Sequence, residues 1–240
     1  MVDIGIEGEE QVAVAAREWI ESVTVEPAIT QRWPDYGVVL VAADGLDPGA
    51  LGDVAERLVE EAGRSALSVD PDAPDPHVLL WREAFRSFGV APRVARSSID
   101  ALLRRASGGN GLPRLGTLVD LYNAISVIHR VPIGGEDLAS YSGAARLVLS
   151  DGTESFLTTA DGEPVVHHPD VGEPVWVDED GVTCRRWNWR QTTRTAISPT
   201  TTDVGFIIDS LDVPGHRGAR GAAEALAALL PGAVVREVLP

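Results

Sequence analysis

Two kinds of hydrophobic pattern divide the chain near its middle. Up to about residue 130 the apolar residues recur mostly every three or four positions, which is typical of amphipathic helices. The predicted helices cover residues 9–20, 48–62, 77–88, 97–106 and 115–130. A continuous apolar run over residues 36–43 interrupts this series and predicts a buried strand.

Short apolar runs dominate from about residue 145 onward. Asp-Gly pairs that begin at residues 151, 161 and 180 separate several of them and favour tight turns between strands. The predicted strands cover residues 146–149, 154–158, 174–177, 182–189, 204–208 and 234–239, with one helix at 218–230. Helices first and antiparallel strands later predict an α+β fold, in which helices pack on antiparallel β-sheets.

A proline-rich segment gives the best candidate for a domain boundary. Three prolines lie between residues 69 and 76, which indicates a loop or a linker. We therefore predict an N-terminal α/β extension over residues 1–75 and a main domain over residues 76–240, packed together as one compact unit. A length of 240 residues is compatible with this division.

The charge of the chain is strongly negative but unevenly distributed. A formal net charge of −16 argues against non-specific binding to nucleic acids, and DNA is not an expected partner. Residues 82–114 nevertheless carry seven arginines and two acidic residues, and residues 184–195 carry four arginines and no acid. Either a localised anionic ligand or ion pairs within the fold would explain these two basic segments, and the sequence leaves both open.

The second basic segment, Cys-Arg-Arg-Trp-Asn-Trp-Arg-Gln-Thr-Thr-Arg-Thr, has the most distinctive composition. In an extended strand its side chains would alternate between two faces. The first face would carry Cys184, Arg186, Asn188 and Arg190, and the second Arg185, Trp187, Trp189 and Gln191. Cationic donors would then lie opposite two large rings. The alternative is that the tryptophans belong to the core and the arginines pair with nearby acids.

Several classes of protein are excluded or disfavoured. A single cysteine excludes a disulfide framework and a multi-cysteine zinc site, and the adjacent His167 and His168 are a poor metal pattern. The sequence has no glycine-rich phosphate loop and no nucleophile elbow, so we expect neither a cofactor nor a metal. No apolar run has the length of a bilayer, and residues 1–10 do not read as a signal peptide. We expect a cytoplasmic protein without membrane contact.

Three ordered segments carry a resemblance to a known family. They are residues 88–92 with 97–105, residues 118–126 with 132–138, and residues 184–190 with 194–195. Together they resemble the free-standing B3/B4 domain proteins, which are relatives of the tRNA-binding and editing module in the β subunit of phenylalanyl-tRNA synthetase. The resemblance covers about residues 77–230.

The resemblance implies a function but does not carry over its catalytic residues. In the synthetase the module hydrolyses the ester of wrongly charged tRNA. Its segments Val-Asp-Val-Thr-Asn and Pro-Leu-His-Ala-Phe-Asp match residues 119–123 and 132–137, so that Asn123 matches an asparagine of the module. The editing histidine of the synthetase, however, aligns with Gly134, and Glu136 replaces a phenylalanine. Hydrolysis therefore cannot simply be inherited.

We hypothesise that the helix near Asn123, a turn at Gly134, Gly135 and Glu136, and the arginine face border one cleft for a negatively charged ligand. Glu136 would bind an α-ammonium group or position a water, and the two glycines would admit the ligand close to the backbone. Arg186, Arg190, Arg194, Trp187, Trp189 and Thr195 complete the predicted binding residues, and Asn188 is the second candidate catalytic residue, as a donor to an oxyanion. The alternatives are a structural hydrogen bond for Asn123 and an arginine ion pair for Glu136.

Three functions remain open at this point. The first is a trans-editing hydrolase that deacylates mischarged tRNA, and the second is a non-catalytic module that binds the 3′ end of tRNA or an amino-acid-like small molecule. The third is a regulatory protein that retains the fold for contact with a partner. The missing histidine favours the second over the first.

Overall fold

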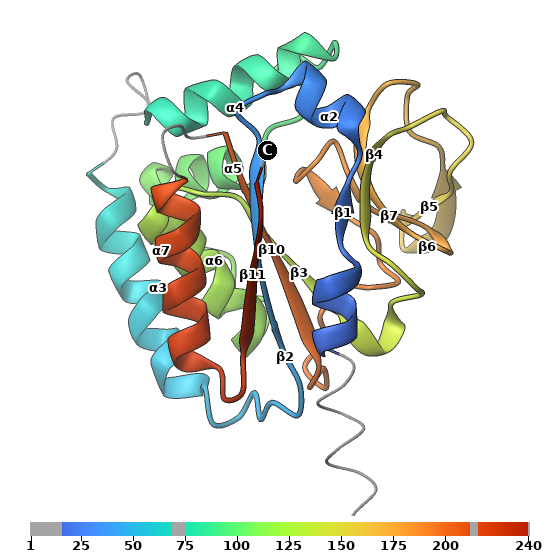
Figure 1. Cartoon of the computed structure of the whole chain (residues 1–240). Helices are drawn as coiled ribbons and strands as arrows, with labels where there is room; N and C mark the ends of the chain where they lie inside the picture. The colour runs from blue at the N-terminus through green and yellow to red at the C-terminus, as the bar shows by residue number, and fades with distance from the viewer. Residues whose placement is uncertain (1–15, 69–74, 212–215, 240) are drawn as a thin grey trace, which may run out of the picture.

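The computed structural model describes residues 16–68, 75–211 and 216–239. Figure 1 shows three layers: a group of helices, a four-stranded sheet, and a second group of strands on the other side of that sheet. The predicted α+β class with mainly antiparallel sheets is confirmed. Within the described residues, no helix combines the length and the apolar character needed to cross a membrane.

The four-stranded sheet is entirely antiparallel and forms the centre of the molecule. Its strands are β2 (Gly37–Ala43), β3 (Ile133–Asp137), β10 (Val204–Ser210) and β11 (Val234–Val238), in the order β11-β2-β10-β3. Every residue of β2 and β10 is buried, because layers cover both faces. The expected buried strand near residues 36–43 is thus confirmed.

Three helices cover one face of this sheet. They are α3 (Gly52–Ala66), α6 (Thr117–His129) and α7 (Arg217–Leu229), which lie together on one side of the strands in Figure 1. Apolar residues of α6 and α7 form one core cluster with Val39 and Val41 of β2 and Phe206 and Ile208 of β10. Residues two apart on a strand share a face, so this cluster identifies the helix-facing side of the sheet.

The second sheet lies on the opposite side. Its strands are β1 (Thr24–Val25), β4 (Arg146–Leu149), β7 (Pro174–Asp178), β8 (Gly181–Arg185) and β9 (Arg190–Gln191), in the order β1-β4-β7-β8-β9. Strand β1 runs parallel to β4, and the other pairs are antiparallel. Strands β5 (Phe156–Ala160) and β6 (Glu163–His167) form a separate hairpin.

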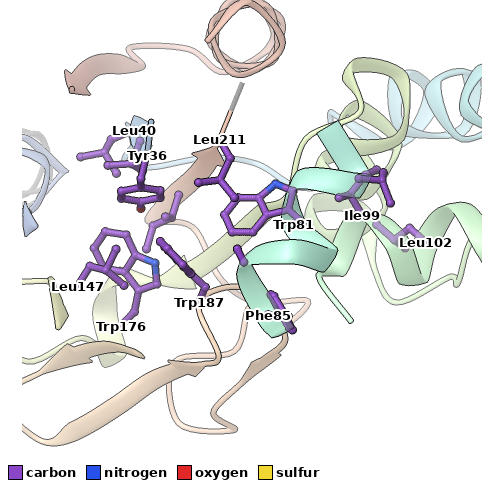
Figure 2. Packing of buried hydrophobic residues seen from close by; sticks show 14 of the residues in the cluster. Tyr36, Leu40, Trp81, Phe85, Ile99, Leu102, Leu147, Trp176, Trp187 and Leu211 are labelled. Atoms are coloured by element: carbon purple, nitrogen blue, oxygen red, sulfur yellow. The ribbon is translucent and has the colours of Figure 1, made fainter. Parts of the chain in front are cut away.

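An aromatic cluster joins the two sheets and the remaining helices. The ring of Trp187 lies 4.6 Å from Trp33, 4.9 Å from Tyr36 and 5.3 Å from Trp81, measured between centroids. Figure 2 shows Trp187 in the middle, with Tyr36 and Trp176 on one side and Trp81 on the other. Ring pairs of this kind prefer edge-to-face contacts and fill a large volume of core.

The remaining helices are α2 (Pro27–Arg32), α4 (Pro76–Ser87) and α5 (Ser98–Arg105), and short helical turns follow at Ala106–Asn110 and Leu138–Ser140. The side chains of Asp75 and Ser97 cap α4 and α5 by accepting hydrogen bonds from the backbone amides of His77 and Asp100. Residues 16–22 are helical, whereas residues 9–15 of the predicted first helix lie outside the described residues, as do residues 69–74 of the proline-rich loop.

Strands from before and after residue 76 occur in both sheets. Strand β2 pairs with β10 and β11, and β1 pairs with β4. The segment 24–43 therefore supplies an edge strand to one sheet and an inner strand to the other, together with strands from the later residues. The division into an extension over 1–75 and a domain over 76–240 stays a prediction.

Two local predictions are wrong. Residues 133–137 form strand β3 rather than a turn, because their backbone pairs with β10 over five residues. Residues 182–189 are not one strand, because the chain turns between β8 and β9. Arg186 and Trp187 have φ values of 47° and 67°, in the left-handed region, and the Trp187 amide donates to the Pro174 carbonyl at 2.7 Å. The predicted alternation of faces therefore ends at Arg185.

Candidate functional site

A small cavity lies between the central sheet and the β8–β9 turn. Its floor consists of Gly134 and Glu136 on β3 and Ile207 and Asp209 on β10. Its other walls are the side chains of Trp176, Cys184, Trp187, Asn188 and Gln191. The volume of the cavity is about 30 Å³. One water molecule needs roughly 10–15 Å³ of such space. The cavity has room for about two non-hydrogen atoms.

Glu136 borders this cavity and is almost completely buried, with 2% of its surface exposed. Gln191 Nε2 donates to Glu136 Oε2 at 2.8 Å and also to the backbone carbonyls of Gly135 and Thr195. Burial disfavours the charged carboxylate and raises the pKa of Glu136 to about 8. Among the ion pairs of the described residues none includes Glu136, so the alternative of an arginine partner does not hold.

Asp209 is a second buried carboxyl group at the cavity, and the sequence prediction missed it. Tyr36 donates its hydroxyl to Asp209 Oδ1 at 2.7 Å, and Asn188 Nδ2 donates to Oδ2 at 3.2 Å. Burial raises the pKa of Asp209 to about 7. The available signal was an acidic residue inside the otherwise apolar strand Val-Gly-Phe-Ile-Ile-Asp-Ser.

The two adjacent glycines lie on opposite faces of β3. A Cβ atom on Gly134 would meet nothing within 4 Å, whereas one on Gly135 would lie 2.7 Å from Ile197, 2.9 Å from Tyr122 and 3.3 Å from Phe206. Gly134 therefore faces open space at the cavity, and Gly135 allows tight packing on the helix-facing side. The sequence hypothesis assumed that both glycines admit a ligand together, and this assumption is wrong.

The arginines do not line this cavity, which corrects the prediction of an anion-binding face. Arg194 binds Asp178 at 2.6 Å, and Arg186 lies 3.5 Å from Glu173 and 3.8 Å from Asp170. Arg190 is exposed on β9. Acidic neighbours thus neutralise Arg186 and Arg194, while the cavity itself is bordered by two carboxyl groups.

The other predicted residues occupy separate places. Trp187 is fully buried in the aromatic cluster and also lines the cavity, and Trp189 is half-buried, with the Arg186 guanidinium 4.3 Å from its ring. Thr195 is buried, and its carbonyl accepts a hydrogen bond from Gln191. Asn123 is buried on α6 but is not among the residues that line the cavity. Of the predicted residues, the structure brings together Gly134, Glu136, Trp187 and Asn188.

The donor set at the cavity does not resemble a metal site. Within the described residues, no group of three or more His, Cys, Asp or Glu side chains is arranged to hold a metal ion. The Cys184 thiol borders the cavity, and burial, reinforced by Glu136 and Asp209, raises its pKa well above the ordinary value. The thiol is therefore neutral at physiological pH and is not an activated nucleophile.

Comparisons with known proteins identify the family of this chain. No curated protein matches the sequence. A crystal structure of an N-terminal fragment of the phenylalanyl-tRNA synthetase β subunit from Pyrococcus horikoshii is similar over 90% of this chain, with 13% sequence identity and a TM-score of 0.43. The chain spans half the length of that fragment. A family model described as the B3/4 domain matches residues 80–215, which is more than half of the sequence. The chain therefore belongs to the B3/4 domain family.

Proposed function

We propose that this protein is a binding module for amino-acid-like ligands, free or attached to the 3′ end of tRNA, and that the cavity beside Gly134 receives one end of the ligand. The observation that carries the proposal is the cavity itself, which lies at the position where the family resemblance expects the editing histidine. With glycine there, the space is open, and hydrogen-bonding groups surround it on β3, β10 and the β8–β9 turn. The relation to the synthetase supports an amino-acid-related ligand, and the cytoplasm is the expected place of action.

A binding screen tests this proposal. Free amino acids, their amides and their methyl esters are titrated into the full chain while the indole signals of the tryptophans are followed by NMR. We expect saturable binding by at least one class, with changes at Trp176 and Trp187, which line the cavity. Gly134→Val should fill the cavity and remove this binding.

Gly63→Ala is the matched control, because Gly63 on α3 also faces open space but lies far from the cavity in the sequence and on another element. Its binding should equal that of the wild type. If no compound in the screen binds saturably, or if Gly134→Val binds as the wild type does, the proposal is wrong.

Hydrolysis of mischarged tRNA is a second candidate function, favoured by one observation. The pKa of Glu136 is raised to about 8, and a carboxylate with a pKa near the working pH is suited to accept a proton from an attacking water. Deacylation of a panel of mischarged tRNAs, including tyrosine-charged tRNA, tests it. Activity should rise with pH up to about 8 and be lost in Glu136→Gln. If the rate of deacylation does not exceed the rate without protein, the hydrolase function is wrong and only the binding function remains.

Contact with tRNA phosphates finds support in the first basic segment. Arg82 and Arg114 form ion pairs there, but Arg86, Arg93, Arg104 and Arg105 are exposed and form none within the described part of the chain. Binding through phosphates should weaken steeply with salt. The double substitution Arg104→Ala with Arg105→Ala should reduce both affinity and salt dependence. The control is Arg220→Ala, which removes an arginine that is paired with Glu237. An affinity for tRNA that does not change with salt would contradict contact with the phosphates.

A further inference from the structure

The cavity is a slot with one carboxyl group at each end. Gly134 of β3 lies directly opposite Ile207 of β10. Glu136 follows two residues later on β3 and Asp209 two residues later on β10, and the strands are antiparallel. The two acids therefore lie in opposite directions from the Gly134–Ile207 pair, with their Cα atoms separated by ~13 Å along the strands. Each end of the slot has its own hydrogen-bond partners.

The Glu136 end already has donors. Gln191 directs its amide to the carboxyl group and to two neighbouring backbone carbonyls. Such an amide fixes the carboxyl group and satisfies it without a ligand. This end is therefore a wall of the slot rather than its binding group.

The Asp209 end has an acceptor that lacks a donor. Asn188 is 6% exposed and gives its Nδ2 group to Asp209, while its Oδ1 atom is buried without a hydrogen-bond partner. A buried polar atom without a partner costs free energy that a suitable ligand can recover. Asn188 borders the slot, so a group that fills this end and donates hydrogens would contact Oδ1 and the Asp209 carboxyl group together.

The two acceptors at this end favour a cation. The acceptors are the Asp209 carboxyl group and the Asn188 amide oxygen. The indoles of Trp176 and Trp187 also border the slot, and their Nε1–H groups are buried donors without a hydrogen-bond partner. No ion pair of the described residues includes Asp209. A carboxylate and an amide oxygen are acceptors that a protonated amine can use, because its nitrogen carries only donors.

The size of the slot limits what the amine can carry. The volume of about 30 Å³ accommodates the ammonium nitrogen and one carbon atom. Gly134 lies in the middle of the slot, and the absence of a side chain there leaves the space that this carbon would take. A branch on the same carbon would need space that the volume does not provide.

We propose that the buried end of the ligand is an aminomethyl group, CH2–NH3⁺, whose nitrogen contacts Asp209 and Asn188 and whose carbon lies against Gly134. This inference deepens the proposed binding of amino-acid-like ligands and rests on it. It assigns the site to unbranched primary amines and glycyl groups, and it makes Gly134 the residue that determines the size of the ligand.

Proton release gives an independent signature of this site. An ammonium group beside Asp209 stabilises the carboxylate, so the carboxyl group gives up a proton to solvent when the amine binds below pH 7. The other titratable groups at the site are Cys184 and Glu136, which line the slot, and Tyr36, which donates to Asp209. Burial raises the pKa of all three, and they stay protonated at that pH. Calorimetry in two buffers with different ionisation enthalpies measures the release.

Methylammonium chloride is the simplest ligand for the test, with tetramethylammonium chloride and sodium acetate as controls. The full chain is titrated at pH 6.5, and the indole signals of Trp176 and Trp187 are followed by NMR. We expect methylammonium to bind saturably with release of a proton, and both controls to give no saturable change. Gly134→Ala, which places a methyl group in the slot without a clash, should weaken methylammonium at least tenfold, while Gly63→Ala leaves it unchanged.

Asp209→Asn should weaken methylammonium at least tenfold and abolish proton release, and Gly134→Ala keeps the inference testable if that variant does not fold. The inference is overturned if methylammonium does not bind the wild type, if tetramethylammonium binds equally well, or if Gly134→Ala binds unchanged. Saturable binding of larger amino acids or esters without binding of methylammonium would overturn this inference alone. Absence of binding by all of these compounds would overturn the proposed function as well.

Discussion

The two faces of the central sheet differ in what they bury. On the helix-facing side, Phe206 and Ile208 pack into a cluster made of apolar residues. On the other side, the same strands carry Glu136 and Asp209, two buried acids that border a cavity. The difference arises because successive side chains along β3 and β10 point to opposite faces of the sheet. Neighbouring residues on one strand therefore serve packing and the cavity in turn.

The comparison shows that a strand can be buried on both sides and still serve two purposes. The apolar face fixes the position of the strands, because its packing tolerates little change of volume. The other face also packs on a large apolar cluster, through Leu40 and Ile207, but its two carboxyl groups and the cavity beside them add little to stability. Substitutions on the two faces should therefore affect different measurements.

The largest effect on stability is expected at Phe206. Phe206→Ala removes a fully buried ring from the helix-facing cluster, which should lower the free energy of unfolding by about 3–5 kcal/mol. Urea denaturation measures the loss, and amine binding by the folded fraction should be unchanged. A loss below about 1 kcal/mol would mean that the helices do not pack on this face as described.

The next effect depends on pH and belongs to the polar face. The pKa of Glu136 is raised from an ordinary value of 4.5 to about 8, so the native state retains a proton that the unfolded state releases. The contribution of Glu136 to the free energy of unfolding is fully present below pH 4.5 and decreases as the pH rises to about 8. Glu136→Gln removes this loss. The variant should match the wild type near pH 4 and exceed it by on the order of 5 kcal/mol above pH 8.

Unfolding midpoints of both proteins between pH 4 and pH 9 test this prediction, and Asp137→Asn on the same strand is the control. Asp209, whose pKa is raised to about 7, gives a similar slope that both proteins retain. Parallel curves for Glu136→Gln and the wild type would show that Glu136 is ionised in the native state.

The sequence predicted the apolar face far better than the polar one. Helical spacing and the apolar run over residues 36–43 depend on local burial, so they anticipated α3, α6 and β2 near their observed positions. Gly134, Glu136 and Asn188 do line one cavity, but the family resemblance drew attention to the first two, and the unusual composition of the second basic segment to the third. Asp209 was missed because a single acid inside an apolar strand has no local pattern that marks it as functional.

The errors in the second basic segment have a common physical cause. Alternation assumes an extended backbone, but Arg186 and Trp187 adopt left-handed conformations that sequence patterns seldom predict for such residues. The partners of the arginines are also distant in sequence, as with Arg194 and Asp178. Strand β3 was mistaken for a turn because two adjacent glycines usually favour turns, whereas here pairing with β10 holds them extended.

Gly135→Ala should have a smaller effect than the two substitutions above. A Cβ atom there would lie 2.7 Å from the Ile197 side chain and 2.9 Å from the Tyr122 ring, so both side chains would have to move. Overpacking of this kind costs about 1–3 kcal/mol. Thermal unfolding should show the loss, and methylammonium binding should persist, since the added methyl group lies on the helix-facing side. Stability equal to that of the wild type would mean that this face is not tightly packed.

Gly134→Ala should have the smallest effect on stability, although it changes the same residue type one position earlier. The added methyl group meets no atom within 4 Å, and replacing glycine by alanine reduces the freedom of the unfolded chain. The free energy of unfolding should therefore stay within about 0.5 kcal/mol of the wild type or rise slightly. Urea denaturation of the two alanine variants, side by side, makes the comparison within one strand. If Gly134→Ala destabilises as much as Gly135→Ala, the space beside Gly134 is filled in solution, and the two faces do not differ in the way described.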